Sequence, residues 1–291
     1  MIEKVECRHY IVVTTSRYCL LFRAAIYFAS MVRRGKLMTD LTWEMNPFGG
    51  ALVDSRSVDP DPNIFSDQLK RAIQTWKHED VKVAWLEILP SCFSAIPIAG
   101  EKGFIFHHAD SDSATMTLDI HAGSFIPPYA THYTGIGGVV INEDNQILVV
   151  SEKYRAAGRG PSYKLPGGAL TQGEHLASAA VREVKEETGI ATEFQALVCF
   201  RHWHGYRYGK SDIYFVAKLK PLSDIITMQE EEIAECLWMD VDEFLSSDTI
   251  HLFNKTIVKA ALLSKGVSPV EIPGYGPSED FEFFMPPDAM A

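Results

Sequence analysis

The chain has 291 residues, of which 46% are hydrophobic, and its formal net charge is -11. This length fits two domains, and the acidic balance argues against broad, non-specific binding to nucleic acid or to an anionic membrane surface. The five cysteines are an odd number without a C-x-x-C spacing, which argues against a disulfide framework or a zinc site and fits a reducing compartment.

Residues 1–40 differ in composition from the rest of the chain. They contain seven basic and three acidic residues, and no acidic residue lies between Glu6 and Asp40. An apolar leader with arginines and few acids is typical of a mitochondrial transit peptide. Arg17 and Arg23 interrupt the apolar run, which argues against a transmembrane segment. We therefore expect either a targeting segment of a mitochondrial protein or a poorly ordered extension of a cytoplasmic one.

Residues 41–128 have the pattern of a small α/β domain. Apolar runs bounded by Gly, Pro and Asp alternate with one long segment of helical periodicity. Two consecutive prolines, Pro127 and Pro128, break both strand and helix and mark the end of the domain. The predicted elements are strands at residues 41–48, 81–89, 104–107 and 116–120 and helices at residues 64–78 and 91–99.

Two adjacent histidines in this domain, His107 and His108, are the residue type of many metal sites. Neighbouring residues of a strand point to opposite faces of a sheet. We therefore expect at most one of the two at any given site, and we favour a core or surface role for both.

Residues 129–266 form the second predicted domain, and residues 267–291, with five prolines, a tail that either wraps the body or stays loose. In the domain, the segment Asn142-Glu143-Asp144-Asn145 indicates a hairpin between two apolar strands. The predicted strands lie at residues 135–141, 146–150, 194–200 and 211–219, and a helix at residues 250–263 closes the domain.

The segment at residues 168–190, GALTQGEHLASAAVREVKEETGI, has a strong helical signature. Thr171 and Glu174 have the spacing of a capping box, and Gly189 is the residue type best suited to a left-handed C-cap. The segment therefore predicts a helix over residues 172–188. Its apolar residues gather on one side and its acidic residues on another, so we expect an apolar side in the core and an acidic side exposed.

Three glutamates of this helix, Glu183, Glu186 and Glu187, lie at positions i, i+3 and i+4. Like charges at this spacing repel by roughly 0.2 to 0.5 kcal/mol per pair, and the helix dipole disfavours them near the C-terminal end. A bound divalent cation removes both costs, and all-oxygen ligands suit Mg²⁺ or Mn²⁺. The alternative is a solvated face that Arg182 and Lys185 neutralise.

The Gly, Glu and Arg positions of the segment resemble the Nudix box, G-x5-E-x7-R-E-U-x-E-E-x-G-U, where U is aliphatic, at every specified position. The resemblance implies the Nudix fold, an α/β/α sandwich with a mixed sheet, here preceded by the smaller α/β domain. It also implies a pyrophosphohydrolase that cleaves a nucleoside diphosphate linked to another group, with Mg²⁺ or Mn²⁺ as cofactor.

The box residues then receive expected roles. Glu186 and Glu187 are the expected principal metal ligands, and Glu183 is a further ligand or the base that positions water. Arg182 is expected to orient a carboxylate through paired hydrogen bonds. In Nudix proteins the backbone carbonyl at the position of Gly168 commonly takes part in metal binding. The predicted catalytic residues are therefore Arg182, Glu183 and Glu187.

Three further glutamates are candidates for an extra metal site or a base. Glu174 is expected to stabilise the loop and the helix start rather than to touch metal. Glu231 and Glu232 lie in a run that resembles the segment after a mobile acidic loop in Nudix proteins, where a glutamate of several relatives binds a further metal or acts as base; a solvated acidic run is the alternative.

Two loops are candidates for substrate binding. Arg155 and Arg159 lie in a predicted basic loop, and arginines can hold a diphosphate bidentately. Residues 201–210 combine positive charge with Trp203 and Tyr206, whose rings can stack on a base. The alternatives are an exposed loop with solvated charges and an aromatic hairpin packed on its own sheet.

The order of segments over residues 41–265 resembles a Nudix subfamily with an N-terminal acetyltransferase-like domain. That subfamily includes plant ADP-ribose and NADH pyrophosphatases and the animal Nudix protein encoded antisense to a fibroblast growth factor gene. We therefore expect a small-molecule nucleotide as substrate, ADP-ribose or NADH first, and a homodimer as an assembly to test. Coenzyme A, dinucleoside polyphosphates, capped RNA and an interaction or regulatory role with little activity are the alternatives.

Overall fold

A computed structural model describes residues 40–154, 162–277 and 279–290, which form two compact units divided after Ala130. The predicted targeting segment, apart from its last residue, and the predicted basic loop with Arg155 and Arg159 lie outside the described residues. None of the described helices is both long and apolar enough to cross a membrane.

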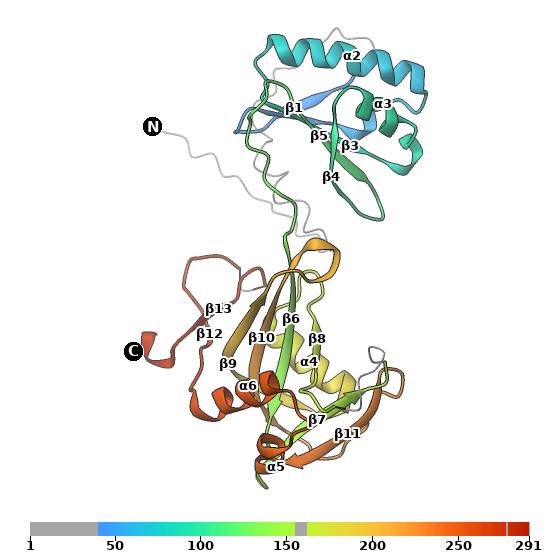
Figure 1. The fold of residues 1–291 in the computed structure, drawn as a ribbon. Coiled ribbons are helices and arrows are strands. Elements are labelled where there is room, and N and C mark those ends of the chain that lie inside the picture. The colour runs from blue at the N-terminus through green and yellow to red at the C-terminus, as the bar shows by residue number, and fades with distance from the viewer. Residues whose placement is uncertain (1–39, 155–161, 278, 291) are drawn as a thin grey trace, which may run out of the picture. The chain divides into compact units, whose positions relative to one another are not determined.

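The first unit is an α/β layer pair (Figure 1). Its sheet has five strands in the order β1-β2-β3-β5-β4, and the parallel pairing of β2 with β3 makes it mixed. Helices α2 and α3 cover one face, because both bury apolar side chains in the same core as alternate residues of β3. The elements are β1 (Trp43–Met45), β2 (Gly50–Val53), α2 (Pro62–His78), β3 (Val83–Ile88), α3 (Ala95–Glu101), β4 (Ile105–Ala109) and β5 (Ala114–Asp119).

The strand predicted at residues 41–48 is present as the shorter β1, but β2, which follows it after a tight turn and pairs with it antiparallel, was not predicted. The side chain of Asn46 accepts hydrogen bonds from the amides of Phe48 and Gly50, at 2.9 and 2.8 Å, and closes the turn. Gly49 has φ +83°, a conformation that glycine adopts without strain. The local turn chemistry therefore divides the apolar run.

The expectation that His107 and His108 point to opposite faces is also wrong. The pairing of β4 with β5 shifts register between Phe106 and His108, and such a bulge changes the direction of the side chains. The two rings lie 4.9 Å apart, and the His107 ring is 4.9 Å from that of Trp85. The histidines therefore pack together on the sheet.

The second unit is a three-layer α/β/α sandwich. Its four-stranded sheet has the order β8-β6-β10-β9 and is mixed, because β10 pairs in parallel with β6 and antiparallel with β9. A separate pair joins β7 to β11. The strands are β6 (His132–Val140), β7 (Gln146–Glu152), β8 (Gly167–Ala169), β9 (Thr192–Trp203), β10 (Ser211–Pro221) and β11 (Ile233–Asp240).

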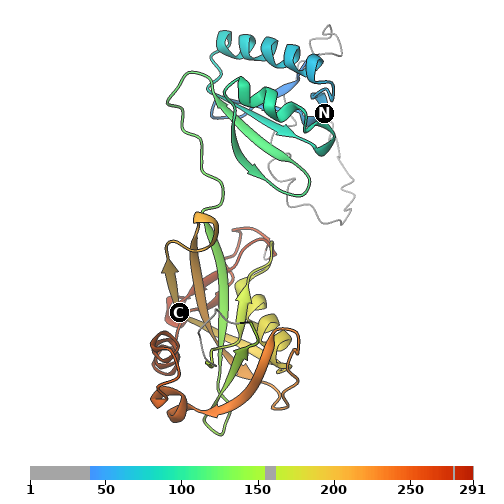
Figure 2. The ribbon, with the colours of Figure 1, turned by 45° about the vertical axis from the view of Figure 1, so that its right-hand side comes forward.

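Helices cover both faces of this sheet, and Figure 2 shows the sheet between α4 and α6. Val139 of β6 lies in the core on the side of α6, and Val140, the next residue, lies in the core on the side of α4. This alternation is the period of a strand with two buried faces. The helices are α4 (Leu176–Thr188), α5 (Val241–Ser246) and α6 (Leu252–Leu263).

One further prediction needs correction, and the tail takes the first of its two expected arrangements, in which it packs on the body of the domain. The turn at residues 142–145 is present, but the strands that flank it do not form a hairpin ladder: they share one bridge, Ile141 with Ile147, and β7 pairs with β11 instead. The tail contains a two-stranded sheet of β12 (Ser268–Val270) and β13 (Phe283–Met285), which packs through Phe284 on the core beside α4. Apolar side chains in the tail therefore outweigh its prolines.

Candidate functional site

The site is built where α4 crosses the short edge strand β8, and two glycines allow the close approach. Gly167 has φ +148°, and a Cβ there would lie 2.3 Å from the backbone oxygen of Ile136. A Cβ on Gly168 would lie 2.6 Å from Oε2 of Glu183. Any larger residue would displace the strand or the carboxylate, so both positions need glycine.

The predicted helix start needs correction, because α4 begins at Leu176 and not near residue 172. Gly173 has φ +78°, which is incompatible with a helix passing through it. The backbone amide and Oγ1 of Thr171 both donate to Oε2 of Glu174, at 3.1 and 2.9 Å. The capping-box residues therefore close a turn before the helix. The predicted C-terminal end is confirmed, with Gly189 at φ +76°.

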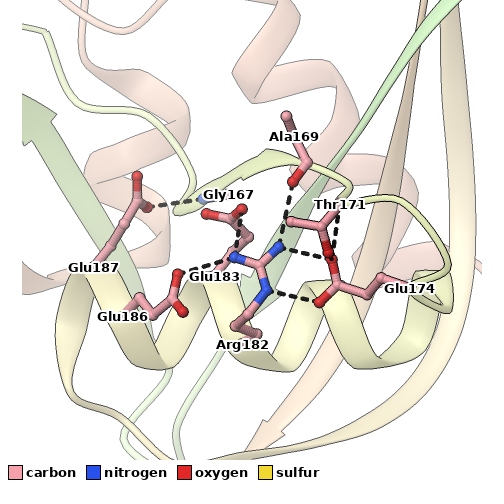
Figure 3. A network of polar contacts seen from close by, with 8 residues as sticks. All are labelled: Gly167, Ala169, Thr171, Glu174, Arg182, Glu183, Glu186 and Glu187. Atoms are coloured by element: carbon pink, nitrogen blue, oxygen red, sulfur yellow. Dashed lines mark hydrogen bonds and ion pairs between the residues drawn. The ribbon is translucent and has the colours of Figure 1, made fainter. Parts of the chain in front are cut away.

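Arg182 links the turn to the helix carboxylates (Figure 3). Its Nε and Nη2 donate to the two carboxylate oxygens of Glu174, at 2.7 and 2.8 Å. Its Nη1 donates to Glu183 and to Glu186, both at 2.9 Å, and Nη2 also reaches the backbone oxygen of Ala169 at 3.3 Å. The hydrogen bonds from Arg182 lower the pKa of Glu174 to about 2. This carboxylate is therefore ionised at neutral pH and fixes the arginine.

The acidic side of α4 is not simply exposed, as expected, because Glu187 is only 7% exposed. Its Oε2 accepts a hydrogen bond of 2.8 Å from the backbone amide of Gly167 (Figure 3). Burial raises the pKa of Glu187 to about 7, although Lys164 and the Gly167 amide lower it in part. Ala179, one turn before Glu183 on the same side of the helix, is fully buried. The sheet covers this side because β8 runs along it.

Glu183 and Glu186 differ in their surroundings. Burial raises the pKa of Glu183, against the lowering effect of Arg182. The side chain of Glu186 is 54% exposed and pairs with Arg182. Of the three carboxylates on this side of the helix, Glu187 is therefore buried, Glu183 is partly buried and Glu186 is exposed.

These residues fit a hard divalent cation. Within the described residues, no group of three or more His, Cys, Asp or Glu side chains is already arranged as a metal site. The donor set of Glu183, Glu186, Glu187 and the Gly168 backbone is nonetheless all oxygen, which Mg²⁺ and Mn²⁺ prefer. A cation would stabilise the buried carboxylate of Glu187, and the missing side chain at Gly168 lets the Glu183 carboxylate lie directly against the backbone of β8.

Comparisons with known proteins decide the family. A NUDIX domain profile matches residues 131–261, and a Nudix hydrolase domain profile matches residues 41–120. Nudix hydrolase 2 of Arabidopsis thaliana is 38% identical over 201 residues, which are 68% of this chain and 72% of that protein. The chain belongs to the Nudix hydrolase family.

The chain is also similar to other proteins. Human Nucleoside diphosphate-linked moiety X motif 6 is 38% identical over 72% of this chain and 68% of its own length. Nudix hydrolase 8 of Arabidopsis thaliana is 38% identical over 70% of this chain, which spans only 56% of that relative. A solved NUDIX hydrolase from Nitrosomonas europaea is 24% identical with a TM-score of 0.40, covering 46% of this chain and 90% of that one. The likeness of the first unit to acetyltransferases stays a prediction.

The predicted aromatic loop of this Nudix domain is shorter than expected, because β9 continues to Trp203 and the loop begins at His204. Arg201 lies on the strand, pairs with the buried Asp212 and has its guanidinium 5.3 Å from the ring centre of Trp203. The Tyr206 ring is also 5.3 Å from that of Trp203. Much of the aromatic surface therefore packs within the hairpin, although Trp203 remains 47% exposed.

Glu231 and Glu232 lie in the exposed turn before β11. The backbone of this turn is attached to the Nudix helix, because the amide of Gln229 donates to the backbone oxygen of Glu187 at 3.2 Å. The backbone oxygen of Glu232 accepts from the amide of Lys153 at 2.8 Å. Their roles as extra ligand or base stay predictions.

Two residues near the site were missed by sequence reasoning. Tyr214 of β10 packs against Gly137, and burial together with the charge of Glu187 raises its pKa. The carboxylate oxygens of Glu282, in the tail, accept hydrogen bonds from the first amides of α4. The alternation of β10 places Tyr214 inward, but nothing in the local sequence relates either residue to the box.

Proposed function

We propose that this Nudix hydrolase cleaves the pyrophosphate bond of ADP-ribose or NADH and depends on Mg²⁺ or Mn²⁺. The family and the site support the reaction class, hydrolysis of a nucleoside diphosphate derivative. The observation that carries the proposal is the buried carboxylate of Glu187, held against Gly167 beside the half-buried Glu183. Burying such charge is costly, and a site for a cation explains it.

The proposal gives each carboxylate of the site a role in metal binding or proton transfer. Glu183, Glu186, Glu187 and the Gly168 carbonyl would hold the divalent ion. When bound, that ion neutralises phosphate oxygens and lowers the pKa of an attacking water. Glu183 and Glu187 are the candidates for the base that takes the proton from this water, because both are partly or fully shielded from solvent.

Arg182 has a positioning role in this proposal. It holds Glu183 and Glu186 from one nitrogen, while the bidentate contact with Glu174 fixes the guanidinium plane. The carboxylates are thus oriented before substrate arrives. Glu174 is engaged on both oxygens by Arg182 and Thr171, which favours a structural role for it over metal binding.

The choice of ADP-ribose or NADH rests on the hairpin. The exposed face of Trp203 can stack on an adenine, and Arg201 beside it supplies positive charge. We infer that Tyr206, packed edge-on against Trp203, holds that ring in place.

A substrate panel tests the proposal. The purified chain is incubated with Mg²⁺ or Mn²⁺ and ADP-ribose, NADH, coenzyme A, diadenosine polyphosphates or capped RNA, and the products are identified. We expect AMP from ADP-ribose or NADH, and no product with Glu187→Gln. If another compound is turned over faster, that compound replaces ADP-ribose or NADH as the proposed substrate. If none is turned over, an interaction or regulatory role is supported. Sedimentation of the same sample tests the homodimer.

A further inference from the structure

The Nudix helix begins without a side-chain cap from its own N-cap residue. The first amides of any helix lack partners within the helix and need acceptors elsewhere. His175 occupies the N-cap position of α4 and provides no side-chain capping hydrogen bond, and the first turn contains no acidic residue. The capping-box pair, Thr171 and Glu174, is used in the preceding turn and by Arg182.

A carboxylate from the tail occupies this position. Oε2 of Glu282 accepts a hydrogen bond of 2.7 Å from the amide of Leu176, and Oε1 accepts one of 3.1 Å from the amide of Ala177. Both contacts are partly buried and join residues more than one hundred positions apart. A negative charge here also interacts favourably with the positive end of the helix dipole.

The tail holds this carboxylate in place through its own structure. Glu282 directly precedes β13, which pairs antiparallel with β12. Val267, immediately before β12, exchanges two backbone hydrogen bonds of 2.9 Å with Leu197 of β9. The ring of Phe284 lies 5.9 Å from that of Phe194 and packs on the core beneath α4. Glu282 is therefore presented to the helix by a packed hairpin.

The position of α4 along its axis matters for the site. The carboxylate of Glu183 lies so close to Gly168 that a single methyl group would not fit between them. Glu187, one turn later, reaches the amide of Gly167. The far end of the helix is held by the hydrogen bond from the amide of Thr227 to the backbone oxygen of Thr188, 2.9 Å. Without Glu282, the first amides of α4 would lack these acceptors, and the first turn would be held only by apolar packing and by the Arg182 contacts further along the helix.

We propose that Glu282 is a positioning residue of the Nudix helix, whose carboxylate replaces the missing N-cap and fixes α4 so that its carboxylates meet Gly167 and Gly168. The inference rests on the proposed function in that these carboxylates are taken as the metal-binding and catalytic ones. It assigns the C-terminal tail a direct part in forming the site.

Glu282→Ala and Glu282→Gln in the full chain test this inference. Glu279→Ala is the matched control, an exposed glutamate three positions earlier in the same tail. Three quantities are measured: amide hydrogen exchange at Leu176 and Ala177, the dissociation constant of Mn²⁺ alone, and kcat and KM separately. Loss of a helix cap corresponds to roughly a fivefold change in a local equilibrium.

For Glu282→Ala we expect roughly fivefold faster exchange at the two amides, with Mn²⁺ binding about fivefold weaker and kcat lowered similarly, while KM for the nucleotide stays within about twofold. Glu282→Gln keeps one acceptor oxygen and is expected to recover part of each loss. Glu279→Ala is expected to match the wild type.

Two results would overturn the inference. Unchanged exchange at Leu176 and Ala177 in Glu282→Ala would show that the carboxylate does not cap α4. Faster exchange with unaltered Mn²⁺ affinity would show that the cap is structural only. Hydrogen exchange and Mn²⁺ binding need no substrate, so they still decide the matter if no nucleotide is hydrolysed and the proposed function fails.

Discussion

Helices α2 and α4 are both amphipathic, but they differ in what caps them and in which polar side chains they bury. In α2, Asp61 accepts hydrogen bonds from the amides of Asn63 and Ile64, at 2.8 and 3.4 Å, and provides the cap locally. Its one fully buried polar side chain, Gln68, is satisfied by the backbone oxygen of Ser57 at 3.1 Å and by an amide at 3.2 Å. The cap of α2 and its buried polar side chain therefore both stabilise the fold.

Helix α4, in contrast, buries an ionisable side chain and relies on partners outside the helix. Glu187 is as buried as many core residues yet ionisable, and burial raises its pKa to about 7. Glu282 accepts from the first amides of α4, and Glu174 accepts from Arg182. Both glutamates lie outside the helix. The difference teaches that a helix can carry inward carboxylates when residues outside it stabilise it. Exchanging features between the two helices tests this contrast.

The largest expected effect comes from Glu187→Gln on α4. Glutamine retains an oxygen for the Gly167 amide but loses the charge that would bind metal, so we expect kcat to fall by about 10²- to 10⁴-fold. The melting temperature is expected not to fall, since a buried charge is removed. Steady-state kinetics and calorimetry measure both, with the exposed Glu193→Gln as control. A near-normal kcat would contradict the metal-ligand role.

The reverse exchange on α2, Gln68→Glu, is expected to destabilise the first unit by about 2 to 4 kcal/mol at neutral pH. The new carboxylate would be buried and would no longer donate to the backbone oxygen of Ser57. Urea unfolding followed by tryptophan fluorescence measures the loss, and Gln74→Glu, on the exposed side of the same helix, is the control. Equal stability of both variants would show that α2 tolerates inward charge.

The Glu174–Arg182 pair predicts a pH dependence. The folded-state pKa of Glu174 is lowered to about 2 from the ordinary value of 4.5, so its contribution to stability is present above pH 4.5 and is lost as pH falls toward 2. We expect Glu174→Gln to lose up to about 3 kcal/mol of stability near neutral pH, and the difference from wild type to vanish below about pH 2. Unfolding free energies across this range provide the measurement; a constant difference would refute it.

The smallest effect is expected from Asp61→Ala, which removes the local cap of α2. A lost N-cap costs about 1 kcal/mol of unfolding free energy. Asp67→Ala, at an exposed position within the same helix, is expected to have no comparable cost. If Asp61→Ala leaves the unfolding free energy unchanged, the local cap does not stabilise α2, and the contrast with the remotely capped α4 is contradicted.

Much of the fold could be predicted from local patterns. The periodicity of residues 64–78 predicted α2 within two residues, because one apolar face faces a core throughout its length. The end of α4 at Gly189 was predicted correctly, because a left-handed cap needs a particular residue type. The Nudix family and the α/β class were confirmed, since they depend on residue type and spacing alone.

The candidate site was predicted less completely. The residues of the box come together as expected, but the burial of Glu187 was missed, because the strand that covers it pairs with β6, about thirty residues earlier in the chain. Trp203 and Tyr206 do lie together, but their packing within the hairpin depends on the register of β9 with β10. Periodicity reports which residues share a face and not what lies opposite.

By itself, then, the sequence determined the candidate residues of the site: the glycines, the arginine and the glutamates at residues 168–190, whose types and spacing suit a divalent cation. Only the tertiary structure decided which glutamate is buried, that Arg182 is fixed by Glu174, and that Glu282 caps α4 from the tail. Local patterns record conformational preference and polarity, whereas burial and remote hydrogen bonds arise when distant segments pack together.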